Sequence, residues 1–266
     1  MEWTQLYQGL AAGFPVFLLV FVRVSGVLAT SPFFASRAIP LPVKALSPLL
    51  LAFLLWPSLP AHTRAPSQWP QYVGAVGAEV LVGVLLGFLI SLAFAVFQMA
   101  GEFVDIPIGF SLANVLDPVF GAQQSILARF LYVLATVVFF AINGHYAILM
   151  AMARSFSILP LGGFRQWPGL TELVTRYFAD TFALAFQVAF PVVAAMLLTD
   201  VAFGIVNRTV PQVNVFIVGF PMKILVGLLF LAILLPFYVA TVERIFSGDS
   251  QLYHLFYQVI TGGGGG

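Results

Sequence analysis

The sequence predicts an all-α membrane protein, and the observations behind this prediction are its composition, its long apolar runs and its prolines. Of its 266 residues, 61% are hydrophobic and only 8% are charged, whereas a soluble domain usually carries about 25% charged residues. The apolar runs are long enough for helices, and strand-like alternation is not sustained in any of them. Prolines recur inside the runs, which favours bent, proline-broken helical hairpins over straight crossings.

We expect a single helical membrane domain over residues 1–261 that packs as one subunit of a larger assembly. Residues 262–266 are all glycine, which predicts a flexible tail or a remnant of cloning. The N-terminus lacks the basic start of a secretory signal, so the first apolar segment is expected to stay attached.

The composition also argues against several functions. A net charge of +1 makes nucleic-acid binding a poor interpretation. The chain has no cysteine, which excludes disulfides, iron–sulfur clusters and thiol catalysis. His62, His145 and His254 stand in no metal-ligand spacing, and neither a Walker A nor a nucleophile-elbow sequence occurs. We therefore predict no enzymatic activity, no catalytic residue, no metal and no cofactor.

Six apolar segments follow one another along the chain, at 10–33, 43–60, 73–100, 126–152, 178–206 and 215–242. If all six crossed a bilayer, five basic residues would flank them on each side, so the positive-inside rule gives no orientation. One side would hold Arg64, Arg154, Arg165, Arg176 and Arg244, and the other Arg37, Lys44, Arg129, Arg208 and Lys223. A bundle of six simple crossings is the plainest interpretation, but it leaves the charges unexplained.

Charged side chains lie within or beside these segments, and a charge at the centre of a bilayer costs about 2.5–3.5 kcal/mol on insertion scales. We expect ion pairs between helices or between subunits, formed by Arg23, Lys44, Glu79, Glu102, Arg129, Asp180, Asp200, Arg208 and Lys223. Glu79, Asp180 and Asp200 leave a proton relay open as a second interpretation. Pairing of these acids with basic side chains is favoured, because the inverted repeats of many transporters are not visible.

The third segment has one distinct face. At about 100° per residue, its polar and small residues fall within one arc of about 140°. These residues are Glu79, Gly83, Gly87, Ser91, Gln98, Glu102 and Asp105. Gly83 and Gly87 form a GxxxG step that lets another backbone approach closely. The face predicts a helix-packing seam through Gly83, Gly87, Ser91 and Gln98, or a water-facing pore wall, and both can hold along different lengths.

The stretch from Gly101 to Arg129 separates two charge-free apolar runs. It carries three acidic residues and four expected helix breakers, namely Pro107, Gly109, Pro118 and Gly121. Non-helical backbone beside membrane helices is buried in protein or lines a water-filled cavity. We therefore predict that this stretch lines or closes a passage.

Two shorter motifs have structural interpretations. Asn143–Gly144–His145 predicts a helix end at which the glycine supplies the turn, with a proton-relay role for His145 as the alternative. Residues 207–223 read NRTVPQVNVFIVGFPMK and predict a bend bounded by Pro211 and Pro221 between the last two apolar segments.

Several motifs in a fixed order carry a family resemblance. They are Arg23, Ser31–Pro32, Arg37–Ala38–Ile39–Pro40, Val43–Lys44, Gly101–Glu102–Phe103, Asp117–Pro118, Leu127–Ala128–Arg129, Asn143–Gly144–His145, Asn207–Arg208, Pro211–Gln212, Asn214 and Gly219–Phe220–Pro221–Met222–Lys223. Together they resemble the FliR family of flagellar biosynthetic membrane proteins, which is related to the SctT export-apparatus subunits of injectisomes. The resemblance runs from about Phe14 to Arg244, and the GFPxK form of the last motif is closer to flagellar members.

The resemblance implies a pore-forming subunit of the flagellar type III protein export gate, in the bacterial inner membrane within the basal body. It implies direct contact with FliP-like and FliQ-like subunits in a helical, hetero-oligomeric cone of bent hairpins. FlhB-like and FlhA-like subunits are implied as further partners, and unfolded export substrates as the cargo. The alternative left open by the residues is an autonomous proton-coupled small-solute transporter.

In the family, a loop of this subunit plugs the closed pore. Mapped by its flanking motifs, the loop lies here at about 109–124, and we call these residues the predicted plug. Apolar side chains can obstruct a pore by excluding water, amides can hydrogen-bond without fixed charge, and glycines can act as hinges. The predicted plug residues are Gly109, Phe110, Ser111, Leu112, Asn114, Val115, Leu116, Asp117, Pro118, Phe120, Gln123 and Gln124.

Overall fold

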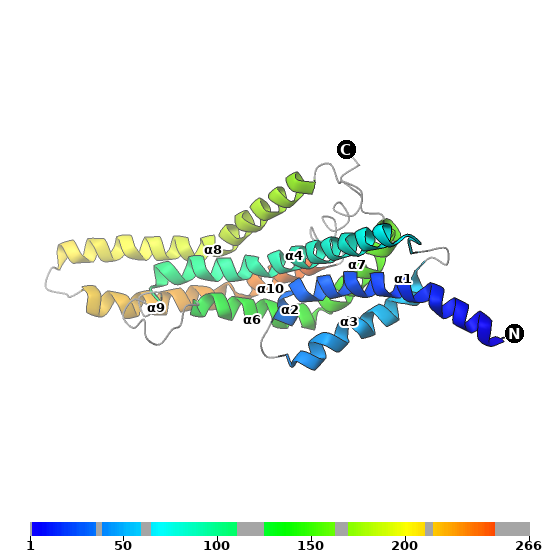
Figure 1. Ribbon diagram of the computed structural model, residues 1–266. Coiled ribbons are helices and arrows are strands. Elements are labelled where there is room, and N and C mark those ends of the chain that lie inside the picture. The colour runs from blue at the N-terminus through cyan, green and yellow to red at the C-terminus, as the bar shows by residue number, and fades with distance from the viewer. Residues whose placement is uncertain are drawn as a thin grey trace. The chain divides into compact units, whose positions relative to one another are not determined.

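The computed structural model describes residues 2–35, 39–59, 65–110, 125–162, 170–210 and 215–247, and all regular structure in these ranges is helical (Figure 1). The helices are α1 (Glu2–Thr30), α2 (Pro32–Ala35), α3 (Leu41–Leu55), the 3₁₀ helix η1 (Trp56–Ser58), α4 (Trp69–Ile108), α6 (Ile126–Ala141), α7 (Gly144–Ile158), α8 (Leu170–Thr209), α9 (Val215–Ile233) and α10 (Leu235–Phe246). Long apolar helices and an absence of strands in the described ranges confirm the prediction of an all-α membrane protein.

The helices belong to two compact units. The first unit contains the described residues up to 92 and from 145 to 176, so it holds α1 to α3, the first part of α4 and α7. The second unit contains residues 93–144 and 177–247, so it holds the rest of α4, α6, most of α8, α9 and α10. Each unit is assembled from segments that are distant in sequence, and the single domain over 1–261 stays a prediction.

Among the described residues, three helical stretches are long and apolar enough to cross a membrane, namely Gly13–Thr30, Trp69–Ile108 and Val174–Thr209. The number rises to five if each of the bent pairs α6–α7 and α9–α10 is one span. The second apolar segment forms only the 15-residue α3, whose length of about 22 Å falls short of a hydrocarbon layer of about 30 Å. The structure therefore differs from six simple crossings, because the second segment is too short.

Proline does not decide where most of these helices end. Pro15, Pro48 and Pro191 lie inside α1, α3 and α8. The 49° bend between α9 and α10 does lie beside Pro236, in the first turn of α10, where a missing N–H costs little. The expectation that Pro107 interrupts the helix is wrong, because α4 continues to Ile108. Pro107 lacks the N–H that would bond to the carbonyl of Phe103, and α4 continues despite the loss of this one bond.

The turn at Asn143–Gly144–His145 differs in detail from the prediction. Asn143, not the glycine, adopts the left-handed conformation, with φ of 58°, which asparagine tolerates better than most residues. Gly144 begins α7 and fits where a Cβ would collide with the ring of Phe139. Glycine is therefore needed for close packing, and asparagine makes the break between α6 and α7.

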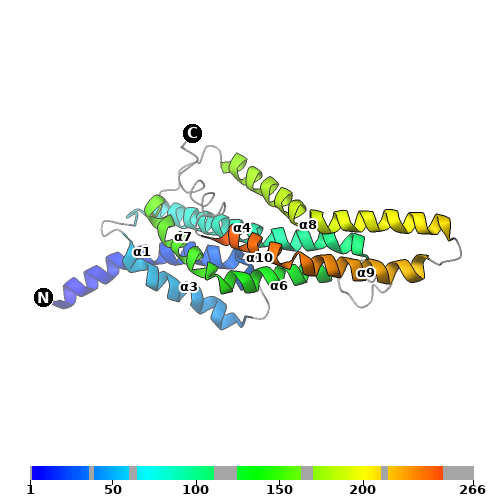
Figure 2. The ribbon, with the colours of Figure 1, turned by 180° about the vertical axis from the view of Figure 1, so that it is seen from behind.

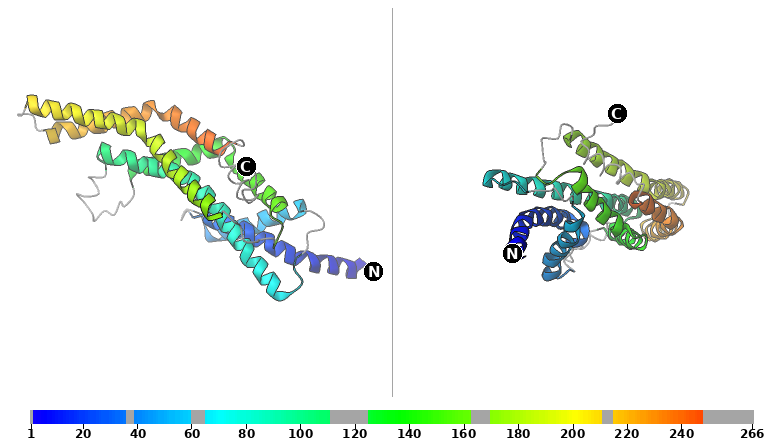
Figure 3. Two further views of the ribbon diagram at one scale, coloured as in Figure 1. Left: turned by 90° about the horizontal axis from the view of Figure 1, so that it is seen from above. Right: turned by 90° about the vertical axis from the view of Figure 1, so that its right-hand side faces the viewer.

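In the first unit, α1 packs closely against the first part of α4, and α3 lies beside α1 (Figures 1 and 3). A Cβ on Gly26 of α1 would lie 3.0 Å from the Cα of Gly83 on α4. A Cβ on Gly87 would collide with the backbone of Val27 and the hydroxyl of Thr30. The GxxxG step thus forms a seam with α1. Further along α4, Ser91 is half-buried and its hydroxyl bonds within its own helix, while Gln98 is exposed.

In the second unit, an aromatic cluster joins α4, α6 and α10, and α9 lies alongside α8 (Figure 2). The ring of Phe94 lies 5.3 Å from that of Phe139 and 4.7 Å from that of Phe246, between centroids. Such contacts stabilise beyond the apolar area that they bury. The part of α4 around Phe94 is therefore held in a packed aromatic core.

Gly83→Ala and Gly77→Ala test the seam with one chemical change at two sites on α4. Alanine favours a helix over glycine by about 1 kcal/mol, and a Cβ on Gly77 meets no atom within 4 Å. A Cβ on Gly83 would collide with the backbone carbonyl of Arg23, and overpacking costs about 1–3 kcal/mol. Gly83→Ala should lower the thermal unfolding midpoint in detergent, whereas Gly77→Ala should raise it or leave it unchanged. Equal midpoints for the two variants would contradict the seam.

Candidate functional site

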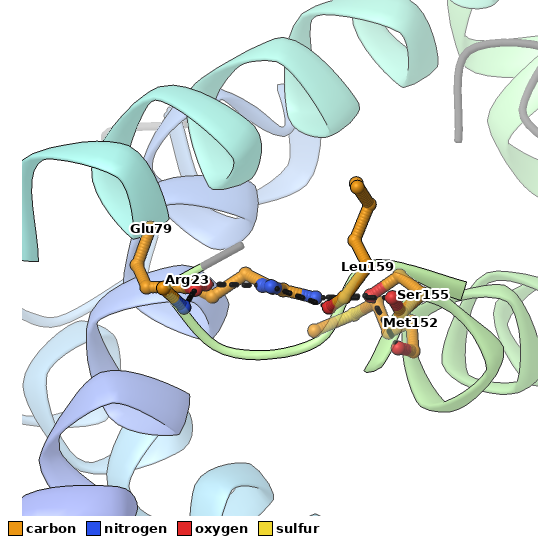
Figure 4. A network of polar contacts seen from close by, with 6 residues as sticks. Arg23, Glu79, Met152, Ser155 and Leu159 are labelled. Carbon is orange, nitrogen blue, oxygen red and sulfur yellow. Dashed lines mark hydrogen bonds and ion pairs between the residues drawn. The ribbon is translucent and has the colours of Figure 1, made fainter. Parts of the chain in front are cut away.

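The most completely satisfied polar site is built around Arg23 in the first unit (Figure 4). The side chain of Arg23 is 3% exposed and forms a salt bridge with Glu79 through Nε. Its Nη1 donates to the carbonyl of Ser155 at 3.1 Å and to the hydroxyl of the same residue at 3.3 Å. Its Nη2 donates to the carbonyl of Leu159 at 3.0 Å, and its guanidinium carbon lies 4.4 Å from the ring centroid of Phe156.

Glu79 completes this site from α4. The carboxylate is buried, and the oxygen that does not bind Arg23 accepts a hydrogen bond from the backbone N–H of Gly162 at 3.0 Å. The carbonyls bound by Arg23 belong to Ser155, in the last turn of α7, and to Leu159, the residue after it. That of Ser155 also accepts from the N–H of Leu159, whereas that of Leu159 lies past the helix end, where carbonyls lack partners within the helix. One cation therefore caps α7 and neutralises a carboxylate of α4. No sequence signal pointed to the carbonyl partners of Arg23, because backbone carbonyls are not encoded by residue type.

A second buried carboxylate lies where α4 meets α6 in the second unit. Asp105 is 3% exposed, and its Oδ1 accepts a hydrogen bond from the backbone N–H of Leu127 at 3.4 Å. The hydroxyl of Ser125 caps the same helix by accepting from the N–H of Ala128 at 3.0 Å. A carboxylate is favoured there because helix N-termini carry unpaired N–H groups and partial positive charge. A Cβ on Gly101 would collide with Ala128, so the two helices touch closely at this point.

Only the first two residues of the predicted plug are described. Gly109 is buried and has φ of 101°, and Phe110 is half-buried. The remaining predicted plug residues lie outside the described residues: Ser111, Leu112, Asn114, Val115, Leu116, Asp117, Pro118, Phe120, Gln123 and Gln124. The structure thus describes the start of this segment and Ser125, the residue that follows it.

The other predicted interface charges divide into paired and exposed groups. Nζ of Lys223 on α9 lies 2.6 Å from Oδ1 of Asp200 on α8. Four further charges are exposed and form no salt bridge with another described residue: Glu102, Arg129, Asp180 and Arg208. Lys44 is half-buried and likewise forms no salt bridge with a described residue. The structure therefore pairs Arg23 with Glu79 and Lys223 with Asp200, and a role of any of these charges in assembly stays a prediction.

The described part of the chain offers no evident metal centre. No group of three or more histidine, aspartate or glutamate side chains among these residues is placed to hold a metal ion. His145 is exposed near the start of α7. The buried charged groups of the described residues, Arg23, Glu79 and Asp105, bind one another, helix ends or nearby backbone.

Comparison with known proteins identifies the family. Residues 14–248 match the model of a family described as bacterial export proteins, family 1. The chain belongs to this family. One relative is the flagellar biosynthetic protein FliR of Bacillus subtilis, which is 35% identical to this chain over 241 residues. The match covers 88% of this chain and 91% of that protein. The FliR proteins of Pectobacterium carotovorum and Escherichia coli are 32% and 30% identical, and each match covers at least 90% of both chains.

These matches confirm the resemblance to the FliR family. Membership supports a role in flagellar protein export for a membrane-associated component of the flagellum. The relatives are named for flagellar biosynthesis and not for a catalysed reaction. The buried sites around Arg23 and Asp105 agree with such a role, because every described contact in them holds one helix to another or to the backbone beside it.

Glu79→Ala tests how strongly the first unit depends on the Arg23 site. Removing one partner of a buried ion pair strands the other charge and costs about 3–5 kcal/mol. The matched control is Glu172→Ala, which removes the partner of Arg176 from a surface pair whose side chains are 72% and 74% exposed. We expect Glu79→Ala to lower the thermal unfolding midpoint in detergent strongly and the control to leave it almost unchanged. Similar midpoints would show that the buried pair contributes little.

Proposed function

We propose that this protein is the pore-forming subunit of the flagellar type III protein export gate, in the bacterial inner membrane within the basal body. It assembles directly with FliP-like and FliQ-like subunits, contacts FlhB-like and FlhA-like subunits, and passes unfolded export substrates. The observation that carries this proposal is the family match over residues 14–248, together with flagellar relatives that align over about nine-tenths of their length.

The exposed charges on apolar helices support assembly with other subunits. Glu102 and Asp180 are exposed on helices that are apolar enough to span a membrane. A charge facing lipid near the bilayer centre costs about 2.5–3.5 kcal/mol on insertion scales. The helix α3 also favours assembly, because it is too short to span a membrane. Its apolar side chains Leu46, Leu50 and Phe53 are each 62% exposed. Neighbouring subunits or an aqueous passage would give the two carboxylates the surroundings that lipid does not, and a neighbouring subunit would also cover the exposed apolar side chains of α3.

The plugging role belongs to residues 109–124 in this proposal. The apolar residues among them obstruct the closed pore by excluding water, and the amide side chains hydrogen-bond without adding a fixed charge. Gly109 supports the proposal because it ends α4 in a conformation that glycine adopts readily, so the chain can leave the helix sharply there.

An autonomous proton-coupled solute transporter is the second candidate. Its three proposed relay carboxylates are Glu79, Asp180 and Asp200. Glu79 binds Arg23 and Asp200 binds Lys223, an arrangement that favours a structural role for two of the three. The export-gate proposal predicts co-purification with other small membrane proteins, whereas the transporter candidate predicts solute uptake by the isolated chain in liposomes.

Deletion of residues 110–122 tests the plug. We expect the assembly to form and to leak small ions, because the apolar obstruction is lost while the described helices remain. Ion flux across membranes that contain the assembly is the measurement, and deletion of residues 262–266 is the control that should stay tight. A deletion variant that assembles and is as tight as the parent would remove the plugging role.

Lys223→Ala and Arg208→Ala test whether charges on α8 and α9 support assembly. Lys223→Ala leaves Asp200 without its partner, and Arg208→Ala removes an exposed cation that has no described partner. Both variants should reduce the yield of the complex that co-purifies with a tagged partner subunit. Arg176→Ala, which changes an exposed pair within α8, is the control. Yields equal to that of the control would exclude the proposed role of these charges.

A further inference from the structure

The last residues of α4 are held against α9 by contacts that depend on glycine. A Cβ on Gly109 would lie 2.8 Å from Cε2 and 3.4 Å from Cζ of Phe220, so the glycine lies directly against this ring. A Cβ on Gly227 would lie 2.5 Å from Cδ1 and Cγ1 of Ile108. Residues seven apart share a face of a helix, so Phe220 and Gly227 contact α4 from the same side of α9.

Gly109 fixes the direction in which the chain leaves α4. Its N–H donates to the carbonyl of Asp105 at 3.0 Å, which ends the helix, and its φ of 101° is disfavoured for any residue with a Cβ. The side chain of Asp105 accepts a hydrogen bond from Leu127, at the start of α6. The first residue of the predicted plug is thus held by α9, and the helix turn before it is held by α6.

The prediction that Pro221 bounds a bend is wrong, because α9 runs from Val215 to Ile233 through this proline. The contact with Phe220 gives the motif around Pro221 a different role. Residues 219–223 are GFPMK, in which Gly219 is buried, Phe220 contacts Gly109, and Lys223 binds Asp200 on α8. The orientation of α9 is therefore tied to α8 three residues after the side chain that touches Gly109. One short motif joins α8 to the residue at which α4 ends.

We propose that the motif at 219–223 positions the first residues of the predicted plug, with Phe220 as the positioning residue. Its ring packs against the side of Gly109 where a Cβ would stand, and this contact restricts the conformations open to Gly109 and Phe110. A rearrangement of α9 relative to α8 would move the ring and release this restriction. What the released segment then does rests on the proposed plugging function, but the positioning itself does not.

The chain has no native cysteine, so Phe110→Cys introduces a single thiol beside the contact. We would measure its rate of reaction with a water-soluble maleimide in membranes that contain the full assembly, with and without Phe220→Ala. Ion flux across the same membranes is the second readout. The control is Phe190→Ala, which truncates a phenylalanine that is 55% exposed on α8.

Phe220→Ala should raise the labelling rate at position 110 about tenfold, because loss of a packing contact makes local opening more frequent. It should also raise ion flux above that of the Phe190→Ala control. Labelling at the rate of the control would overturn the proposal. If Phe220→Ala does not accumulate, Gly109→Ala tests the same contact from the other side, because its methyl group would press into the ring. Labelling of Gly109→Ala at the rate of the control would likewise overturn it.

The two readouts separate the positioning from the plugging function. Faster labelling in Phe220→Ala supports the positioning even if the deletion of 110–122 proves tight, in which case only the plugging function fails. Unchanged labelling in Phe220→Ala together with a leaky deletion variant refutes the positioning and leaves the plugging function intact.

Discussion

A buried guanidinium has to be neutralised and fully hydrogen-bonded, and the arrangement of α1, α4 and α7 in the first unit follows from this requirement. Arg23 obtains its acceptors from α4 and from the end of α7, which places three segments around one side chain. Gly26 lies three residues after Arg23, and Gly83 lies four residues after Glu79, so the glycine contact and the ion pair are one helical turn apart on both helices. Close approach of the backbones brings the charges together, and their pairing in turn stabilises that approach.

The sequence predicted those features that depend on periodicity and residue size. The positions of the helices follow from the apolar runs, although two of the runs form bent pairs, and the α1–α4 contact follows from a GxxxG step that removes two side chains from one face. It could not predict which groups Arg23 binds, because two of its four acceptors are backbone carbonyls of a segment about 130 residues away. Sequence reasoning also misplaced helix breaks, because the effect of a proline depends on the groups packed around it. Proline inside a helix is tolerated where neighbouring groups satisfy the freed carbonyl, whereas Asn143 broke the α6–α7 pair without any proline.

In the second unit, the end of α4 depends on two contacts of different physical kinds. The contact of Asp105 with α6 is electrostatic, because a carboxylate faces the unpaired N–H groups of a helix start. The contact of Gly109 with Phe220 is steric and has no charge. The two therefore respond to different changes: a shift of α9 would disturb the ring contact while leaving the carboxylate in place. An export gate of the proposed kind needs such a difference, because the segment that closes it has to move while the helices around it stay assembled.

The polar face of α4 supports assembly with other subunits more specifically than the composition does. Its first part, with Glu79, Gly83 and Gly87, is covered by α1 and by the Arg23 site. Gln98 and Glu102 continue the same arc of the helix, one turn apart, and both are exposed. Asp105 lies on the same arc but is buried against the start of α6, so Gln98 and Glu102 are exposed members of a face that is covered on either side of them. Lipid suits them poorly, because an amide and a carboxylate would lose their hydration there. These two residues are therefore best suited to a partner subunit or to water in a passage, and both belong to the gate that we propose.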